Sequence, residues 1–228
     1  MAADLLVRIH LGPVTLEGNL TLPAKPAGVV LFAHGSGSSR HSPRNRFVAE
    51  QLQRAGFTTL LMDLLTADEE AIDRQTRALR FDIGLLADRL VGAIDWLGRE
   101  PSTHALSVGC FGASTGAAAA LVAAAHRPER VSAVVSRGGR PDLAGPALPA
   151  VKAPTLLIVG GDDTPVIPLN EYALGRLGSP IKNLLIVPGA SHLFEEPGTL
   201  DEVARMAAEW FTRYLGSEPR IQRAVRAE

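Results

Sequence analysis

The sequence predicts an α/β domain: a mostly parallel, twisted sheet of about eight strands, with helices on both faces and an antiparallel hairpin at the N-terminus. Short, continuously apolar runs alternate with helix-like segments along most of the chain. Such runs are typical of strands covered on both faces, and the strand–helix alternation produces right-handed, parallel βαβ units. The runs lie at 28–34, 57–64, 105–112, 131–136, 155–161 and 183–189.

The elements between and before these strands have local signals of their own. Partial alternation of apolar and polar residues predicts the hairpin, with a turn at 12–13 and a bulge at Gly18. Helix-like patterns occupy 43–55, 86–99, 114–128, 169–178 and 199–215. The residues at 199–202 predict a capping box that opens the last helix, whereas 68–82 is polar and ambiguous.

Length and composition indicate one large domain with a substantial core. The chain has 228 residues, of which 46% are hydrophobic, so we expect a single domain over 1–217 and a charged C-terminal tail over 218–228. Lysine plus arginine number 23 and aspartate plus glutamate 24, which gives a formal net charge of −1. A balance of this kind gives no basic field for nucleic acid or an anionic membrane.

Cysteine usage and the N-terminal segment bear on the compartment. A lone cysteine, Cys110, excludes an internal disulfide and a cysteine-rich metal site, and makes the reducing cytoplasm the expected location. The N-terminal residues lack the pattern of a signal peptide, and polar residues interrupt the apolar runs before they reach the length of a membrane span.

The stretch CFGASTG, residues 110–116, places Ser114 between two glycines as G-x-S-x-G, with a predicted strand before it and a helix after it. This is the context of a nucleophilic serine on a tight strand-to-helix turn. The turn strains the serine backbone and exposes its hydroxyl at the helix N-terminus, where partial positive charge favours a developing oxyanion. The alternative is an ordinary tight turn that lets the helix pack closely on the sheet.

Two further strand ends carry the partners that a serine nucleophile needs. The loop after 155–161 holds Asp162 and Asp163, and we favour Asp163, which lies deeper in the loop, as the acid that orients a histidine. His192 follows the last predicted strand in a loop of small residues and suits a general base. Caps, solvated acids and a structural histidine are the alternatives. His34 ends a strand and is interpreted as organising its loop by hydrogen bonding.

The loop HGSGSS, residues 34–39, fits the same chemistry. A tetrahedral intermediate needs two N–H groups aimed at its oxyanion. We expect one from Thr115, the residue after the nucleophile, and the other from Ser36, with Gly37 as the second choice. The rival interpretation is a phosphate-binding loop, but the chain lacks the glycine and lysine spacing of the known nucleotide-binding motifs.

These motifs, in this order, resemble those of the α/β-hydrolase superfamily, and most closely of the small dienelactone-hydrolase-like proteins. The resemblance covers nearly the whole core. It implies an eight-stranded sheet with the second strand antiparallel, a triad of Ser114, Asp163 and His192, and hydrolysis of esters or thioesters without metal or organic cofactor. Dienelactone hydrolases proper carry cysteine at the position of Ser114, and Cys110 lies inside the strand, where it cannot substitute.

Two loops bear on substrate access. Many α/β-hydrolases insert a cap after the strand that corresponds to 131–136, but here only 137–154 separates that strand from the next, so the fold lacks a large cap. We therefore expect an open, shallow site with 65–82 as the other partial cover.

Several loop arginines could form an anion site for an acidic substrate, with Arg40, Arg44 and Arg137 (and Gly37 of the oxyanion loop) as the candidate binding residues. Arg46 and Arg140 lie close by. The alternative is that these arginines are solvated or paired with the acids Asp63, Asp142 and Glu195.

Three functions remain open from the sequence. A serine hydrolase that acts on a small-molecule ester or thioester comes first. An acyltransferase could use the same triad, and a protein of this fold could also bind a small ligand without catalysis. The sequence leaves the oligomeric state open, a homodimer included.

Overall fold

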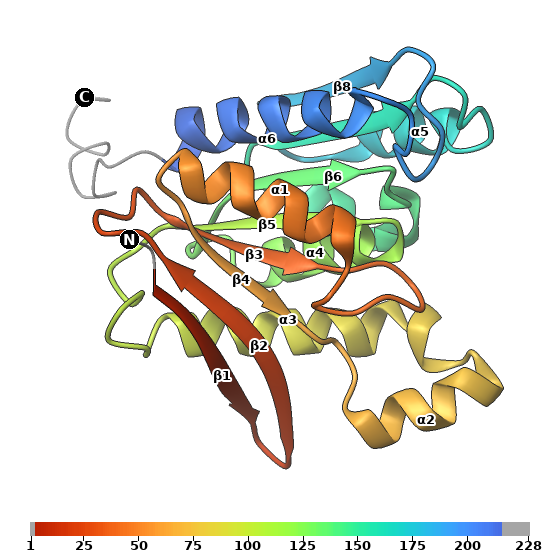
Figure 1. Ribbon diagram of the computed structural model, residues 1–228. Helices are drawn as coiled ribbons and strands as arrows, with labels where there is room; N and C mark the ends of the chain where they lie inside the picture. Colours follow the sequence, from red (N-terminus) through yellow and green to blue (C-terminus); the bar gives the residue numbers. More distant parts are fainter. Residues whose placement is uncertain (1–2, 216–228) are drawn as a thin grey trace.

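A computed structural model of the chain describes residues 3–215 (Figure 1). These residues form one eight-stranded sheet in the order β1-β2-β4-β3-β5-β6-β7-β8. β1 and β2 make the antiparallel hairpin, β2 is also antiparallel to β4, and every later pairing is parallel. The fold class predicted from the apolar runs is therefore confirmed, with the second strand antiparallel as the resemblance implied.

The strands lie close to the predicted runs. Their bounds are β1 Ala3–Leu11, β2 Val14–Leu22, β3 Val29–Ala33, β4 Thr58–Met62, β5 Val108–Ala113, β6 Val131–Arg137, β7 Thr155–Gly160 and β8 Lys182–Val187. All residues of β3, β4, β5 and β7 are buried, because these strands are covered on both faces. β8 is an edge strand and is more exposed.

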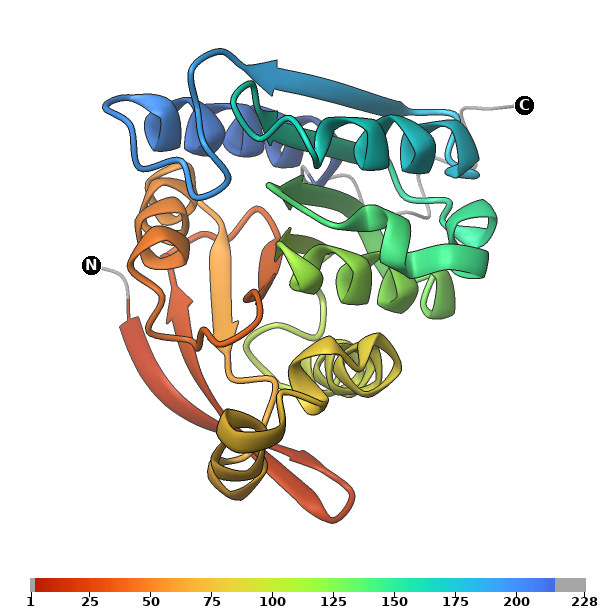
Figure 2. The same ribbon diagram turned by 90° about the vertical axis from the view of Figure 1, so that its right-hand side faces the viewer.

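Two helical layers cover the sheet (Figures 1 and 2). One face packs on α1 and α6, and the other packs on α3, α4, α5 and the 3-10 segment η2. The helices are α1 Pro43–Arg54, α2 Ala67–Thr76, α3 Ile83–Leu97, α4 Thr115–His126, α5 Ile167–Arg176 and α6 Thr199–Leu215, and the 3-10 segments are η1 Leu79–Phe81 and η2 Pro141–Ala150. Helix α2 and η1 stand apart from both layers, beyond the end of β4 (Figure 1).

Two local predictions about the hairpin and the last helix were wrong. Gly18 is no bulge, because the β1–β2 register runs through it without a shift. The glycine instead gives room to the Leu60 side chain, since a Cβ at this position would lie only 2.9 Å from the Leu60 Cδ1. The Thr199 hydroxyl donates to the Glu196 carbonyl rather than capping α6.

The capping box lies at α2, in the segment that the sequence left ambiguous. Thr66 accepts from the Glu69 backbone N–H, and the Glu69 carboxylate accepts from the Thr66 backbone N–H. Two of the four orphan N–H groups at this helix start are satisfied in this way, which explains why so polar a segment is helical. Within residues 3–215, none of the helices is both long and apolar enough to cross a bilayer.

Candidate active site

The loops that follow β3, β5, β6, β7 and β8 all lie at the carboxyl ends of the strands, because these strands are parallel and point the same way. Figure 2 views the molecule from these strand ends. The side chains predicted to carry chemistry sit on these loops: Ser36 after β3, Ser114 after β5, Asp163 after β7 and His192 after β8.

Ser114 occupies a strained turn between β5 and α4. Its φ is 51° and its ψ is −123°, a conformation that residues with a Cβ rarely adopt. The flanking glycines permit the turn: a Cβ on Gly112 would lie 2.4 Å from the Ala117 Cα, and one on Gly116 would lie 2.3 Å from the Ala33 carbonyl oxygen. The strained serine and the steric need for both glycines agree with what the sequence predicted for a nucleophile.

His192 and Asp163 are directly hydrogen-bonded. The imidazole Nδ1 lies 2.6 Å from Asp163 Oδ2, and Asp163 is buried while Asp162 is exposed. Because a carboxylate can only accept, Nδ1 carries the proton and donates it, which leaves the lone pair on Nε2. Of the two candidate aspartates, Asp163 is the one that the fold pairs with the histidine.

The histidine loop has supports that sequence reasoning missed. The Glu196 carboxylate accepts a hydrogen bond of 3.0 Å from the Ser191 backbone N–H, and the side-chain and backbone hydrogen bonds of Ser191 lower the pKa of Glu196. Phe194, fully buried, holds a φ of 56° and closes the turn through its N–H to the Ser191 carbonyl. In the sequence, Glu196 is visible only as an acid four residues after His192, and this spacing does not predict its hydrogen bond to the Ser191 backbone.

The two predicted oxyanion residues lie next to each other. The side-chain hydroxyls of Ser36 and Thr115 are 2.9 Å apart, which ties the loop after β3 to the first residue of α4. Among the described residues, neither backbone N–H of this pair has a hydrogen-bond partner. Two free donors next to Ser114 are what a developing oxyanion requires.

His34 organises the oxyanion loop, as its position suggested. Its Nδ1 lies 2.9 Å from the Gly35 carbonyl, and its Nε2 accepts from the Leu64 backbone N–H at 3.2 Å. Burial lowers the pKa of His34, against the opposing effects of the Gly35 hydrogen bond and of the charges on Asp63 and Glu70. With both ring nitrogens engaged, His34 is a neutral link between β3 and the end of β4.

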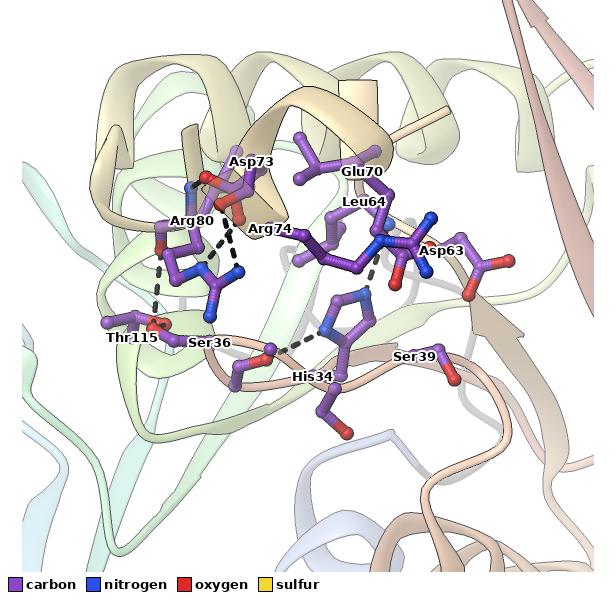
Figure 3. A pocket seen from close by; sticks show the side chains of 15 residues that line it. His34, Ser36, Ser39, Asp63, Leu64, Glu70, Asp73, Arg74, Arg80 and Thr115 are labelled. Atoms are coloured by element: carbon purple, nitrogen blue, oxygen red, sulfur yellow. Dashed lines mark hydrogen bonds and ion pairs between the residues drawn. The ribbon is translucent and has the colours of Figure 1, made fainter. Parts of the chain in front are cut away.

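A first cavity, here called the α2 cavity, lies between the oxyanion loop and the α2–η1 segment and measures about 200 Å³ (Figure 3). Its walls include Gly37, whose φ is +70°, and the side chains of Arg74 and Arg80. Asp73 fixes η1 to α2 by accepting from two backbone N–H groups and from the Arg80 Nε. The α2–η1 segment therefore covers this cavity beside the oxyanion loop, but it contributes no residue to the cavity that Ser114 and His192 line, so the expectation that 65–82 covers the catalytic site is not confirmed.

A second cavity, here called the Ser114 cavity, measures about 240 Å³ and is lined by both Ser114 and His192. Ser36, Arg44 and Arg137 also line it. The serine and the imidazole therefore face one space, from loops that lie 78 residues apart in the chain. Among residues 3–215 the Ser114 hydroxyl has no hydrogen-bond partner, so the structure shows the His192–Asp163 link of the predicted triad but no hydrogen bond between Ser114 and His192.

The candidate binding arginines divide into paired and unpaired groups. Arg40 donates to Asp63 and to Glu17 and lines a separate cavity, so the structure does not bring it to Ser114. Arg44 pairs with Glu195 at 2.9 Å but also lines the Ser114 cavity. Arg137 lines the same cavity and has no acidic partner among the described residues.

Known proteins share this fold and much of this sequence. A family model described as "Dienelactone hydrolase family" matches residues 16–215. The chain belongs to the dienelactone hydrolase family. A solved structure of a dienelactone hydrolase from Anabaena variabilis has 65% sequence identity and a TM-score of 0.92, and the match covers 94% of this chain and 99% of that one.

A distant structural relative and a longer sequence relative were also found. The ferulic acid-bound structure of Est1E from Butyrivibrio proteoclasticus has a TM-score of 0.76 at 15% identity, with 91% of this chain and 98% of that one covered, and shows the shared fold. A Mycobacterium tuberculosis protein provisionally named a phosphoribosyl transferase is 59% identical over 92% of this chain. The chain spans about half of that relative, 46% of its length. Membership of the dienelactone hydrolase family supports hydrolase activity.

In this member of the dienelactone hydrolase family, serine stands at the turn and the cysteine lies elsewhere. Cys110 is 1% exposed inside β5, and burial raises the pKa of its thiol to about 12. A thiol held in this form is no nucleophile. Among the described residues, no group of three or more histidine, cysteine, aspartate or glutamate side chains is placed to hold a metal ion.

Proposed function

We propose that the protein is a serine hydrolase that cleaves small carboxylic esters or thioesters through an acyl-enzyme on Ser114. The observation that carries the proposal is the shared cavity of Ser114 and His192, together with the 2.6 Å hydrogen bond from His192 to Asp163. A nucleophile, a base with its free nitrogen defined, and an orienting acid are the three groups that this chemistry needs.

In the first half-reaction, His192 Nε2 takes the Ser114 hydroxyl proton while Oγ bonds to the substrate carbonyl carbon. The carbonyl oxygen becomes an oxyanion, and we assign as its donors the backbone N–H groups of Ser36 and Thr115, which have no partner among the described residues. Asp163 stabilises the imidazolium that forms. The C–O or C–S bond then breaks, and His192 returns the proton to the leaving alkoxide or thiolate.

In the second half-reaction, water replaces the leaving group. His192 takes a proton from water, the hydroxide oxygen attacks the acyl carbon, and collapse of the new tetrahedral intermediate releases the carboxylic acid and restores Ser114. Ser36 lines both the α2 cavity and the Ser114 cavity, so these two cavities are the candidate spaces for the two parts of an ester.

A panel of p-nitrophenyl esters of increasing chain length and of acyl-CoA thioesters tests the proposal. We expect turnover by the wild-type protein and loss of turnover in Ser114→Ala. Repeating the assay with an added alcohol or thiol separates hydrolysis from acyl transfer, since a transferase would divert most of the acyl group to the added acceptor. Folded wild-type protein that cleaves no member of the panel would favour a non-catalytic ligand-binding protein.

A further inference from the structure

We propose that Asn170, a residue of α5, positions the backbone N–H of Thr115, one of the two donors assigned to the oxyanion. The inference rests on the proposed function, because it adds a positioning residue to the same reaction. Asn170 is not among the residues that line the Ser114 cavity or the α2 cavity. It acts from behind the site, through two peptide units that are hydrogen-bonded in series, in an arrangement here called the Asn170 relay.

Asn170 is a fully buried polar side chain whose orientation is fixed by its neighbours. It is 0% exposed, and its Nδ2 donates to the Gly139 carbonyl at 3.0 Å and to the Val166 carbonyl at 2.9 Å. A reversed amide would turn its oxygen toward two carbonyl oxygens, so the observed orientation is the favourable one. Because a buried amide costs free energy unless it is hydrogen-bonded, these two contacts define what the side chain does in the fold.

The first peptide unit of the relay joins Gly139 to Arg140, in the loop after β6. The Gly139 carbonyl and the Arg140 N–H belong to the same planar unit and point in opposite directions, so a partner that holds one group also directs the other. The Arg140 N–H donates to the Ser114 carbonyl at 3.0 Å. The Asn170 side chain therefore directs the donor that this loop offers to the nucleophile turn.

The second peptide unit joins Ser114 to Thr115, and the same geometric argument applies. Because the Ser114 carbonyl and the Thr115 N–H share one plane, fixing the carbonyl fixes the direction of the oxyanion donor. Ser114 needs such support, since its φ of 51° and ψ of −123° lie outside the well-populated regions of backbone conformation. The Ala117 N–H also donates to this carbonyl at 3.1 Å, from within α4, and Arg140 holds it from outside the helix.

Close packing makes the relay stiff. A Cβ on Gly139 would lie 2.0 Å from the Ser136 Oγ and 2.6 Å from the Ala117 Cβ, so this peptide unit is confined between β6 and α4. Gly139, Thr115 and Asn170 are all buried. Hydrogen bonds in series polarise one another in a region of low dielectric, so the relay both directs the Thr115 N–H and strengthens it as a donor.

Kinetics of Asn170→Leu test the inference, with Asn183→Leu as the matched control at an exposed asparagine of β8. The leucine has no donor, so the Gly139 carbonyl loses its partner and the Thr115 N–H loses its direction. We expect kcat for the best p-nitrophenyl ester to fall roughly tenfold or more, short of the roughly 10²–10³-fold cost of removing an oxyanion donor outright. KM should stay near the wild-type value, because the interaction is made in the transition state. Asn183→Leu should keep both constants.

A thionoester of the same acyl group distinguishes an oxyanion effect from general damage to the site. Its sulfur accepts hydrogen bonds more weakly than oxygen does, so a misdirected donor slows the ester more than the thionoester. The ratio of ester to thionoester rates should therefore fall in Asn170→Leu and stay unchanged in Asn183→Leu. Equal losses for the two substrates, or an unchanged kcat, would overturn the inference while the proposed hydrolase remains.

Amide NMR spectra and hydrogen exchange test the relay independently of turnover. In Asn170→Leu we expect the Thr115 and Arg140 amide resonances to shift and the Arg140 N–H to exchange faster, whereas Asn183→Leu should leave both as in the wild type. These changes would support the relay even if no ester is cleaved. Unchanged Thr115 and Arg140 amides would overturn it, whatever the activity.

A second variant and a stability measurement keep the test valid. Asn170→Asp keeps the shape of the side chain but replaces its amide donor, and it should give the same changes in kcat and in the Thr115 amide if Asn170→Leu does not fold. All rates are measured well below the Tm of each variant. A fall in Tm without a change in kcat or in the Thr115 amide would assign Asn170 to stability alone and contradict the inference.

Discussion

Asp163 determines which nitrogen of His192 is free to accept a proton. The 2.6 Å hydrogen bond fixes the proton on Nδ1, so Nε2 is the nitrogen that can accept the serine proton. Its neighbour Asp162 is exposed and donates its backbone N–H to the Ala190 carbonyl at 3.0 Å. Two adjacent aspartates thus have different roles, decided by burial and by direction rather than by residue type.

Asp163→Asn should lower kcat by about 10⁴-fold, because an amide at this position permits the wrong imidazole tautomer. Asp162→Asn is the matched control, one residue away in the same loop, and should keep the wild-type rate. Steady-state assays on the best p-nitrophenyl ester check both variants. Equal loss of activity in the two would indicate that the loop, rather than one carboxylate, matters.

His34 makes stability depend on pH. Burial lowers its pKa below the ordinary 6.5, against the pull of Asp63 and Glu70, so the folded protein binds fewer protons there than the unfolded chain. Stability then rises with pH from the lowered folded pKa up to about 6.5, and it falls as the pH decreases through that interval. Urea unfolding at neutral pH and at lower pH should show the fall in the wild type.

The variant His34→Gln should show a smaller fall over the same pH range, while His41→Gln, an exposed position of the same loop region, should show the wild-type slope. A His34→Gln slope equal to that of the wild type would assign the pH dependence to other groups.

The sequence singled out the residues proposed to carry the chemistry because each has a local signature: a glycine-flanked serine, and an acid and a histidine at later strand ends. The pairing of Arg40, Arg44 and Arg140 with acids also agreed with the alternative drawn from the sequence. The supports were not predictable. Glu196 holding Ser191, and Arg137 left without a counter-ion, depend on contacts between loops whose packing no local pattern encodes.

At the scale of the elements, the close approach of α4 to β3 holds the site together. A Cβ on Gly116 would lie 2.3 Å from the Ala33 carbonyl oxygen and 2.5 Å from that of His34. Both contacts are with backbone at the end of β3, which cannot move without displacing the oxyanion loop. The glycine is therefore required by the packing of a helix on a strand rather than by its own dihedral angles.

Gly116→Ala should lower the free energy of unfolding by about 1–3 kcal/mol or more. It should also lower activity, because the added Cβ displaces the end of β3 and with it the oxyanion loop that contains Ser36. Gly175→Ala in α5 is the matched control, since a Cβ there meets nothing within 4 Å; it should be neutral or stabilising by about 0.5–1 kcal/mol. Chemical denaturation of both variants measures the difference. A Gly116→Ala protein as stable as Gly175→Ala would contradict the packing.

Element boundaries show which local rules hold. The strands and the main helices were predicted from apolar runs because burial on both faces leaves a strong pattern. Helix α2 was not predicted, because it is stabilised by the Thr66–Glu69 capping box and by the hydrogen bond that Asp73 accepts from the Arg80 backbone N–H in η1. Burial acts to raise the pKa of Asp73, but the hydrogen bonds and charge of Arg80 outweigh it and keep the pKa low.

At the scale of the whole molecule, one side chain reports on the integrity of the sheet. Cys110 lies in the central strand β5, fully covered, and is the chain's single cysteine. Burial raises the pKa of its thiol to about 12, so the folded protein offers neither access nor thiolate. Reaction of Cys110 therefore requires opening of the core.

Labelling with a disulfide reagent should be negligible in native buffer at neutral pH and stoichiometric in urea, and its midpoint should coincide with that of unfolding followed by circular dichroism. The expected coincidence follows from cooperative unfolding of a single domain. Rapid labelling of the folded protein, or a midpoint well below the unfolding transition, would show that β5 opens locally.

The layered α/β architecture was predictable because strand–helix alternation has few compact solutions. The order of the strands was not. β4 lies between β2 and β3, so the hairpin joins the sheet through antiparallel pairing with a strand that follows it by more than 30 residues. Such pairing depends on which strand edges come together in the folded protein, and no pattern within an individual strand predicts it.

The most direct test is the reaction of the folded protein with a fluorophosphonate, followed by mass analysis of the labelled peptide. We expect one adduct per chain, on Ser114, with labelling lost in Ser114→Ala and strongly slowed in His192→Gln because the serine proton then has no acceptor. No adduct on folded wild-type protein, or an adduct that persists in Ser114→Ala, would contradict the assignment of Ser114 as the nucleophile.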